Sequence, residues 1–394
     1  MIIQPKIRGF ICTTAHPVGC SRYVQTQIDY VKKHPPIQNG PKNVLVIGSS
    51  TGYGLASWVV AAFGCRAKTL GVFFERPCEN KRTATAGWYN AVAIEKAARS
   101  EGLYARSFNG DAFCDEMKQN VVDAVKKDVG PLDLIVYSLA SPRRIHPKTG
   151  QVAKSVLKPI GSSYTNKSID FDSNQVVQLT LPAATEEEIQ QTVSVMGGED
   201  WEMWIDALEQ AGLIAAGAVS LAYSYIGPEI TTPVYRGGTI GRAKDHLEET
   251  ARRLDGRFKK RGGRALISVN KALITQSSSA IPFIPLYFVL LRKVMKQKGI
   301  DEDCIQQIYR LFSSRLYTGK EIPVDSGGRI RIDELEMRTD VQMEVNRLWQ
   351  NVTTENIFGI SDLKEYHKDF LKLFGFGLPG VDYNQEVDPD LQLS

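Results

Sequence analysis

The sequence predicts an α/β protein in which helices cover both faces of a doubly wound parallel sheet. From about residue 43 to 270, short apolar runs rich in β-branched residues alternate with helical patterns. The runs are continuously apolar, as strands buried on both faces are, and a glycine-rich turn follows the first of them. With 394 residues, the chain is long enough to bury the large core that this class needs.

The strands and helices of this sheet can be assigned in chain order. The expected strands are NVLVI (43–47), KTLGVFF (68–74), LYARSF (103–108), LDLIVYS (132–138), AVSLAYS (218–224) and RALISV (264–269). Helical patterns separate them at about 54–63, 87–101, 114–128, 200–211 and 240–254. The last pattern starts near Thr239 and carries an apolar stripe at spacings of three and four: Ile240, Ala243, Leu247, Ala251 and Leu254.

Two regions depart from this alternation. Residues 145–195 are rich in turn formers and alternate apolar with polar side chains, which predicts a β-hairpin insertion. Helical patterns at 281–315 and 333–375 predict extra helices at about 280–375. The sequence shows no internal repeat, no low-complexity tract and no linker long enough to separate domains. We therefore expect residues 1–394 to form a single domain with its core at about 40–275.

Composition excludes several classes of protein. A net charge of +4 is too small for a dedicated nucleic-acid binder. The six cysteines include no CxxC pair, which is typical of reduced thiols in the cytosol. Cys12, His16 and Cys20 match no common zinc spacing, so no metal is expected. The sequence has no signal peptide pattern, and its most apolar run, 280–291, is too short to cross a bilayer. These observations predict a cytoplasmic protein without a transmembrane segment.

The turn after the first strand has the pattern of a dinucleotide site. Gly48, Gly52 and Gly54 form G-x3-G-x-G between a strand and an apolar helix. Glycines let the backbone turn sharply and approach a pyrophosphate, which the helix N-terminus then stabilises. Three neighbouring hydroxyls add donors: Ser49, Ser50 and Thr51. Although any tight turn could use such glycines, their place after the first strand of an alternating sheet favours a Rossmann-type cofactor site.

Further polar residues follow the other strands. The second strand ends at Phe74 and Glu75, and a carboxylate there can accept hydrogen bonds from an adenosine ribose and repel a 2′-phosphate. The alternative is a solvated surface glutamate, and Arg76 beside it could accommodate the 2′-phosphate. This position favours NADH over NADPH. Asp111 and Ala112 follow the third strand and Leu139 and Ala140 the fourth, where the same crevice is expected, although each alone could be an ordinary loop.

Tyr235 and Lys244 are candidate catalytic residues. Nine residues of continuous helix turn through about 900°, which would leave the two side chains on opposite faces. Gly237 and Gly238 lie between them, however, so Tyr235 is expected in a loop that folds back over Lys244. A nearby ammonium favours the phenolate and makes the phenol a better proton donor. The alternative is a surface tyrosine and a solvated lysine.

These residues carry a family resemblance. The motifs GSSTGYGLA, FFERP, GWYN, NGDAF, YSLASPRR, VMGGEDW, YSYIGPE, Tyr-x8-Lys and SSAIPFIPLY together resemble the FabV-type enoyl-ACP reductases and the related trans-2-enoyl-CoA reductases. The similarity runs from MIIQPKIRGFICTTAHP to FLKLFGFG, nearly the whole chain. The motifs are specific, because ordinary short-chain dehydrogenases space the pair Tyr-x3-Lys and the commoner enoyl reductases Tyr-x6-Lys.

The resemblance implies a single catalytic domain, a monomer and NADH as the cofactor. Tyr235 would be the proton donor, Lys244 a cofactor ligand, and Tyr225 a substrate contact. The residues expected to line NADH are Gly48, Ser49, Ser50, Thr51, Gly52, Tyr53, Phe74, Glu75, Asp111, Ala112, Leu139, Ala140, Lys244, Leu273, Ile274 and Thr275.

The implied reaction is NADH-dependent reduction of a trans-2-enoyl thioester, either enoyl-CoA or enoyl-ACP, as the last step of a fatty-acid elongation cycle. Two alternatives stay open: a carbonyl or 3-ketoacyl reductase, for which Ser224 is a poor serine partner, and a non-catalytic NADH-sensing protein. The run 280–291 could be a buried helix or a wall of the acyl pocket that Pro282 and Pro285 open into a loop. A basic run follows that could meet CoA phosphates or acyl carrier protein, or be a solvated face: Arg292, Lys293, Lys296 and Lys298.

Overall fold

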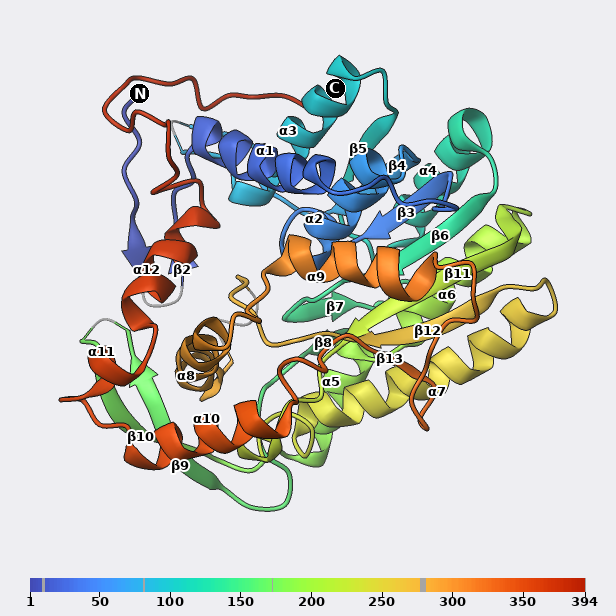
Figure 1. Cartoon of the computed structure of the whole chain (residues 1–394). Coiled ribbons are helices and arrows are strands. Elements are labelled where there is room, and N and C mark those ends of the chain that lie inside the picture. Colours follow the sequence, from blue (N-terminus) through green and yellow to red (C-terminus); the bar gives the residue numbers. More distant parts are fainter. Residues whose placement is uncertain (9–10, 81, 172, 277–280, 394) are drawn as a thin grey trace.

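A seven-stranded parallel sheet forms the centre of the computed structural model, which describes residues 1–8, 11–80, 82–171, 173–276 and 281–393 (Figure 1). The strand order is β13-β12-β11-β6-β3-β4-β5. The bounds are β3 (Asn43–Ile47), β4 (Lys68–Phe73), β5 (Ala105–Asn109), β6 (Leu132–Tyr137), β11 (Ile214–Ser224), β12 (Arg264–Val269) and β13 (Arg329–Arg331). The order reverses between β3 and β6, which is where doubly wound sheets bind ligands. All six predicted strands are confirmed, and β13 is an addition.

Helices cover both faces, as the alternation predicted. The predicted helices are α2 (Gly52–Val59), α3 (Ala86–Ser100), α4 (Asp115–Ala124), α6 (Glu199–Gln210) and α7 (Thr239–Lys259). On β3, Val44 and Val46 face the core that contains α2 and α3, whereas Leu45 and Ile47 face the core under α4, α6 and α7. Helix α1 (Pro17–Lys33), which packs on α3, was not predicted.

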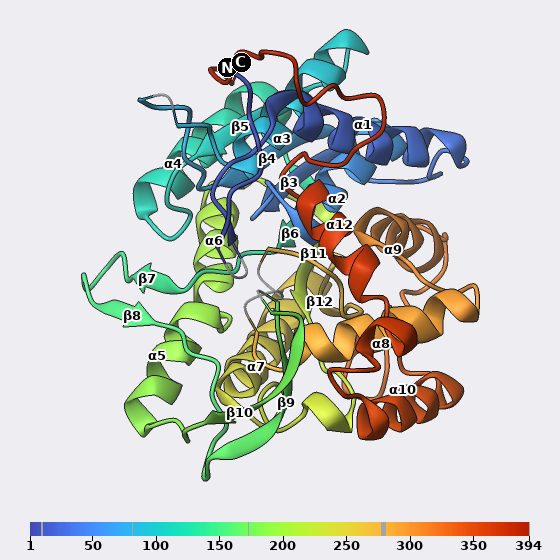
Figure 2. The same cartoon turned by 90° about the vertical axis from the view of Figure 1, so that its left-hand side faces the viewer.

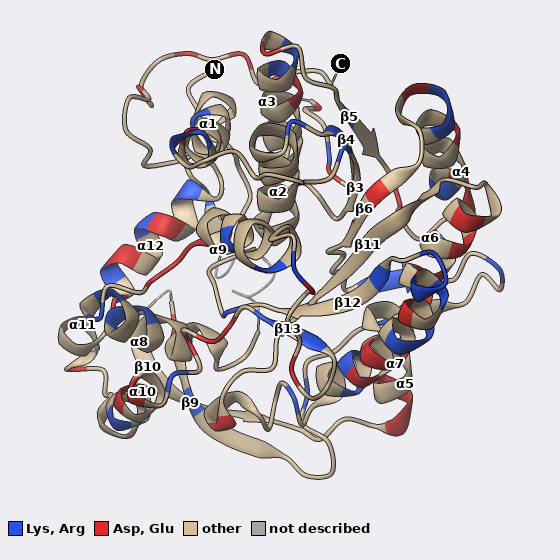
Figure 3. Ribbon diagram, turned by 45° about the vertical axis from the view of Figure 1, so that its right-hand side comes forward, with Lys and Arg blue, Asp and Glu red and all other residues tan. Residues whose placement is uncertain are grey.

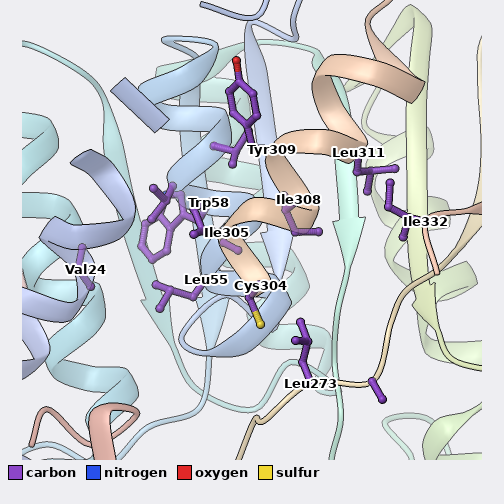
Figure 4. Close-up of a cluster of buried hydrophobic side chains, with 14 of the residues drawn as sticks. Val24, Leu55, Trp58, Leu273, Cys304, Ile305, Ile308, Tyr309, Leu311 and Ile332 are labelled. Carbon is purple, nitrogen blue, oxygen red and sulfur yellow. The ribbon is translucent and has the colours of Figure 1, made fainter. Parts of the chain in front are cut away.

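Helix α2 is buried inside the first of these cores. Leu55 and Trp58 on α2 lie among side chains of α1 and of α9 (Cys304–Leu311), including Val24 and Ile305 (Figure 4). The Trp58 indole donates to Thr69 Oγ1 on β4 at 2.8 Å, so its polar atom is satisfied. Helix α2 carries no charged side chain, whereas the outer helices α6 and α7 carry many (Figure 3). The helix after the glycine turn is thus held by packing on several sides.

The insertion after β6 contains two hairpins and a helix rather than the single hairpin that was predicted. Strands β7 (Arg143–Ile145) and β8 (Val152–Lys154) form the first, and β9 (Tyr164–Asp170) and β10 (Gln175–Leu181) the second. Helix α5 (Glu186–Met196) follows, capped by Thr185 and Glu188. The second hairpin lies beside α10 (Thr339–Asn351), where Lys167 Nζ donates to the carbonyls of Trp349 and Val352 (Figure 2).

The predicted C-terminal helices are also present. They are α8 (Ile284–Gln297), α9, α10, α11 (Ile357–Ile360) and α12 (Leu363–Lys372). Pro285 lies in the first turn of α8, where a missing N–H costs no hydrogen bond, so it does not open the helix into a loop as one interpretation expected. Ile284 to Leu291 are buried, in agreement with a buried helix, and residue 280 lies outside the described residues.

The two ends of the chain meet on the surface. The remaining N-terminal strands, β1 (Ile7–Arg8) and β2 (Ile11–Cys12), form a small hairpin. The Met1 ammonium donates to Val387 O at 2.7 Å, and Val387 N–H donates back to Met1 O at 3.0 Å (Figure 2). The tail continues to Leu391, whose carbonyl accepts from the Trp88 indole on α3 at 2.7 Å. Across the described ranges, no helix has the length and apolar character that crossing a membrane requires.

Candidate active site

The glycine turn after β3 is too tightly packed for other residues. Gly48 has φ +86°, and a Cβ there would lie 2.4 Å from Ser138 O at the end of β6. A Cβ on Gly54 would lie 1.8 Å from Gly48 O. The turn thus places the N-terminus of α2 directly against the loop that contains Leu139 and Ala140. Ala140 is exposed in this loop, and Leu139 is half-buried.

The N-terminus of α2 fits an anionic group. The first turn of α2 contains no acidic residue, and the side chain of its N-cap, Thr51, makes no capping hydrogen bond. The free amides and the positive end of the helix dipole suit a pyrophosphate. The hydroxyls differ from the prediction. Ser49 is buried with its hydroxyl on Val72 O, and Ser50 donates to Glu75, so neither hydroxyl is a free donor.

Glu75 lies at the N-terminus of α3. Its Oε1 accepts from Ser50 Oγ at 2.7 Å and would lie 2.1 Å from a Cβ on Gly87. The Asn109 side chain, at the end of β5, bonds both the N–H and the C=O of Glu75, at 2.7 and 2.9 Å. Burial raises the pKa of Glu75, and hydrogen bonds from Thr85 and Ser50 oppose this shift. Phe74 beside it is 77% exposed, an apolar surface suited to an adenine ring.

A buried ion pair supports the loop after β5. Lys118 Nζ donates to Ala112 O at 3.1 Å and to Asp200 Oδ1 at 2.8 Å, and both charged side chains are buried. The Asp111 carboxylate accepts from the N–H of Phe113 at 2.9 Å and so shapes the same loop. The sequence did not predict this pair, because its members lie on α4 and α6, 82 positions apart.

The loop after β12 closes over the glycine turn. A Cβ on Gly52 would lie 3.3 Å from Thr275 Cγ2. The Tyr53 hydroxyl lies 2.8 Å from Lys271 O. Leu273 packs into the cluster around α2 and α9, and Ile274 is half-buried (Figure 4). The structure therefore gathers the predicted cofactor residues at the carboxyl edge of the sheet.

Tyr235 lies in the loop before α7, as the glycines predicted. Helix α7 starts at Thr239, and Gly241 allows the chain to approach itself, because a Cβ there would lie 1.9 Å from Arg236 O. The Tyr235 ring packs edge-on against the Tyr225 ring, with centroids 4.9 Å apart. Tyr235 is buried, and its hydroxyl makes no hydrogen bond to any residue that the structure describes. It is therefore a free donor at this edge.

Lys244 is held at the end of β11. Its Nζ donates to Tyr223 O at 3.2 Å, and burial lowers its pKa to about 8, which Glu248 opposes. The expectation that Lys244 favours a Tyr235 phenolate is wrong in this state, because burial raises the pKa of Tyr235. Tyr235 is thus a neutral donor, and Lys244 keeps two N–H groups for another partner.

The Tyr225 hydroxyl is hydrogen-bonded to Glu336, which the sequence did not mark as a site residue. This hydroxyl donates to Glu336 Oε1 at 2.9 Å. The same oxygen accepts from the Tyr287 hydroxyl at 2.7 Å. Glu336 lies in a polar stretch after β13, where no spacing marks it as a site residue. Tyr225 therefore cannot give the same hydrogen to a substrate without breaking this bond.

The basic run at 292–298, in the second half of α8 and just after it, forms ion pairs within the chain. Arg292 contacts Asp301, Asp362 and Asp369. Lys296 pairs with Asp362 and Lys298 with Asp340, each at 2.8 Å. These pairs within the chain favour the solvated face over a site for CoA phosphates or a carrier protein. Among the residues with described positions, no group of three His, Cys, Asp or Glu side chains could hold a metal ion.

Comparisons with known proteins relate this chain to one family. Residues 82–317 match the family model described as the trans-2-enoyl-CoA reductase catalytic region. Residues 2–80 match that of the NAD(P)H binding domain of trans-2-enoyl-CoA reductase. An enoyl-acyl-carrier-protein reductase (NADH) of Opitutus terrae is 57% identical over 100% of both chains. A trans-2-enoyl-CoA reductase (NADH) of Ruminiclostridium cellulolyticum is 54% identical over 100% of this chain and 99% of the relative.

Solved structures match over the same length. The trans-2-enoyl-CoA reductase of Clostridium acetobutulicum in complex with NADH has a TM-score of 0.96 at 44% identity, covering 99% of this chain and 98% of that one. The Treponema denticola trans-2-enoyl-CoA reductase in complex with NAD has a TM-score of 0.95 at 49% identity, covering 100% of both.

Residues 324–387 match a third family model, described as an enoyl reductase FAD binding domain. This segment, all of it described, forms β13, α10, α11 and α12. None of these elements forms the strand, glycine turn and helix that hold a dinucleotide pyrophosphate. Strand β13 is instead the edge of the sheet that carries the glycine turn after β3. The segment therefore has no Rossmann-type dinucleotide site of its own.

Proposed function

We propose that this chain, which belongs to the trans-2-enoyl-CoA reductase family, is an NADH-dependent enzyme that reduces a trans-2-enoyl thioester to the saturated acyl thioester. The observation that carries the proposal is that Tyr235, whose hydroxyl is free, packs on Tyr225 just after β11, and that Lys244 contacts the end of the same strand at Tyr223 O. A proton donor and a cofactor site at one edge are what reduction of a polarised double bond requires.

Bound NADH supplies a hydride to the β-carbon of the enoyl group. Negative charge then develops on the thioester oxygen, to which Tyr235 donates a hydrogen bond or proton, and the α-carbon takes a proton from solvent to complete the saturated product. Tyr235 suits this role better than Tyr225, because the Tyr225 hydroxyl already donates to Glu336. Burial of Tyr235 keeps it neutral, so its hydrogen is present when the charge forms.

Lys244 holds the cofactor and adds positive charge. One of its N–H groups is fixed on Tyr223 O, which leaves two to donate to the ribose hydroxyls. Lys244 lies on α7, and its bond to Tyr223 O places the ammonium at the end of β11, the strand that leads to Tyr225. Lys244 therefore binds and orients the cofactor, and Tyr235 donates the proton.

The pH dependence of kcat/KM for NADH tests the state of Lys244. Since its pKa is about 8, the ammonium is lost as pH rises through 8, and kcat/KM for NADH should fall above that pH. Unfolding does not explain such a fall. An unfolded lysine keeps its proton to higher pH, so this group's contribution to stability increases above pH 8. We would measure kcat/KM for NADH against pH and record thermal melts at the same pH values. The kcat/KM profile should bend near pH 8 in the wild type and should not bend there in Lys244→Met. An identical inflection in both proteins would assign it elsewhere.

A spectrophotometric comparison tests the function itself. Oxidation of NADH and of NADPH is followed with crotonyl-CoA, a long-chain enoyl-CoA, an enoyl-ACP and a 3-ketoacyl-CoA. We expect turnover with the enoyl thioesters and NADH. Turnover with the ketoacyl thioester alone would favour a carbonyl reductase, and none with any thioester would favour an NADH-sensing protein.

Glu75 is expected to set the preference for NADH. Glu75→Gln removes the charge but keeps an acceptor for Ser50. Two like charges about 4 Å apart repel by about 1–4 kcal/mol near a protein surface. The ratio of kcat/KM for NADH over NADPH should therefore narrow by roughly tenfold or more. An unchanged ratio in a folded variant would show that Glu75 does not distinguish the ribose of NADH from the 2′-phosphorylated ribose of NADPH.

We further propose that residues 1–394 act as one catalytic domain, that the enzyme is a monomer in the cytoplasm, and that either CoA or acyl carrier protein can present the enoyl group. The sheet takes strands from all three matched segments, which supports one domain. Sedimentation at several protein concentrations, with and without NADH, tests the monomer.

A further inference from the structure

Glu336 is a fully buried carboxylate with three hydrogen-bond donors around it. Its side chain has 0% exposure. Oε1 accepts from Tyr225 at 2.9 Å and from Tyr287 at 2.7 Å, and Oε2 accepts from the N–H of Ala272 at 2.7 Å. Burial raises the pKa of Glu336, and the bonds from all three donors, which suit an ionised carboxylate, oppose this shift. Such an arrangement fixes the positions of its partners.

The three donors belong to three different parts of the candidate active site. Tyr225 follows β11 and packs against Tyr235. Ala272 precedes Leu273, Ile274 and Thr275, the loop that closes over the glycine turn. Tyr287 lies in α8, the helix that was a candidate wall of the acyl pocket, and its hydroxyl also accepts from Gln342 Nε2 at 3.1 Å. One side chain therefore connects the loop at Ala272, Tyr225 and helix α8.

Glu336 also affects Tyr235 indirectly, because Tyr225 contacts both residues. The rings of Tyr225 and Tyr235 meet edge-on at 4.9 Å, so the orientation of the Tyr225 ring limits that of Tyr235. With its hydroxyl held by Glu336, Tyr225 cannot rotate away from this contact. The direction of the hydrogen bond matters too, since it leaves Tyr235, rather than Tyr225, as the free donor.

We propose that Glu336 is a positioning residue for the reduction: it orients Tyr225, and through it Tyr235, while holding the cofactor loop at Ala272. This inference rests on the proposed function. It assigns Glu336 no contact with substrate or cofactor. Two measurable consequences follow, one on turnover through the tyrosines and one on NADH binding through the loop.

Glu336→Gln is the informative variant, because glutamine has the same shape. If its amide oxygen faces the two tyrosines, its NH2 meets the N–H of Ala272, and two donors oppose each other. If the amide is turned, both tyrosine hydroxyls lose their acceptor. Either way at least one hydrogen bond to a charged group is lost. We expect this loss to lower kcat/KM for NADH by roughly 10- to 100-fold. We expect kcat to fall and KM for NADH to rise in a protein that melts near the wild-type temperature.

A double-mutant comparison distinguishes a specific effect of Glu336 on Tyr225 from a general loss of packing in the site. Tyr225→Phe should lower kcat without changing KM for NADH, because the bond to Ala272 remains. If Glu336 acts on turnover through Tyr225, the double variant should have nearly the kcat of the lower single variant, with the raised KM of Glu336→Gln. Fully additive losses in kcat would overturn the proposal. Tyr287→Phe, which removes one bond and leaves the carboxylate, should raise KM for the enoyl thioester and leave KM for NADH unchanged.

Glu334→Gln is the matched control. Glu334 lies two residues away, is partly exposed and pairs with Arg310 and Arg315. It should keep wild-type kinetics, and equal losses in both Gln variants would also overturn the proposal. Failure of the proposed function would look different: the wild type would not oxidise NADH with an enoyl thioester. NADH titration by fluorescence would then still test whether Glu336→Gln weakens cofactor binding.

Discussion

Tyr235→Phe is expected to lower kcat by roughly 10²–10³, the loss typical of one donor to a developing oxyanion, with little change in NADH affinity. The change removes only a hydroxyl that bonds no described residue, so neither the fold nor the Tyr225 contact depends on it. The measurement is steady-state oxidation of NADH with crotonyl-CoA, alongside NADH binding by fluorescence.

Tyr225→Phe serves as the comparison for this prediction. Its hydroxyl is occupied by Glu336, so its removal should cost less turnover than the loss at Tyr235. If Tyr235→Phe turned over normally while folded and binding NADH, the proton would come from Tyr225 or from water. Tyr235 would then be an ordinary loop tyrosine that packs on Tyr225.

Lys244→Met is expected to have the second large effect, on two parameters at once. Methionine has a similar unbranched stem but cannot donate to the ribose or place a charge at the end of β11. We expect KM for NADH to rise and kcat to fall, so that kcat/KM for NADH drops by roughly 10²–10³. Removing a buried charge should not lower the melting temperature, since burial alone already disfavours the ammonium.

The double variant Tyr235→Phe, Lys244→Met distinguishes a cooperating pair from two independent residues. If the two act as a unit, its loss should be well short of the product of the single losses. A Lys244→Met enzyme with unchanged KM for NADH would contradict a role in cofactor binding. Lys244→Arg is a useful control, because it keeps the charge but not the compact ammonium.

Periodicity and turn chemistry made much of this structure predictable. The six apolar runs, the glycine turn and the start of α7 at Thr239 depend on local pattern, and local pattern was sufficient. Helix α1 was also encoded locally, since Cys20, Val24, Ile28 and Val31 form a buried face at spacings of three and four. The pairing of Asn109 with Glu75 needed only the rule that strand ends share one edge.

Residues whose role depends on distant partners could not be predicted. Glu336 resembles many surface glutamates in sequence, and only the fold brings Tyr225, Tyr287 and Ala272 to it. The basic residues after α8's start were read from charge alone, but their acidic partners lie up to 77 positions away. The pKa of Tyr235 was misjudged for a related reason, because burial of Tyr235, which raises this pKa, depends on the fold around it.

The meeting of the chain ends also constrains the order in which the protein can be completed during synthesis. Trp88 is translated long before its partner Leu391, which lies 303 positions later in the chain. Likewise, α9 is translated after α2, which it covers, and Glu336 is translated after Tyr225, whose hydroxyl it binds. Domains fold as units once their chain is available, and pairings between distant residues form slowly. The glycine turn is therefore translated well before α9 and Glu336, which complete its support.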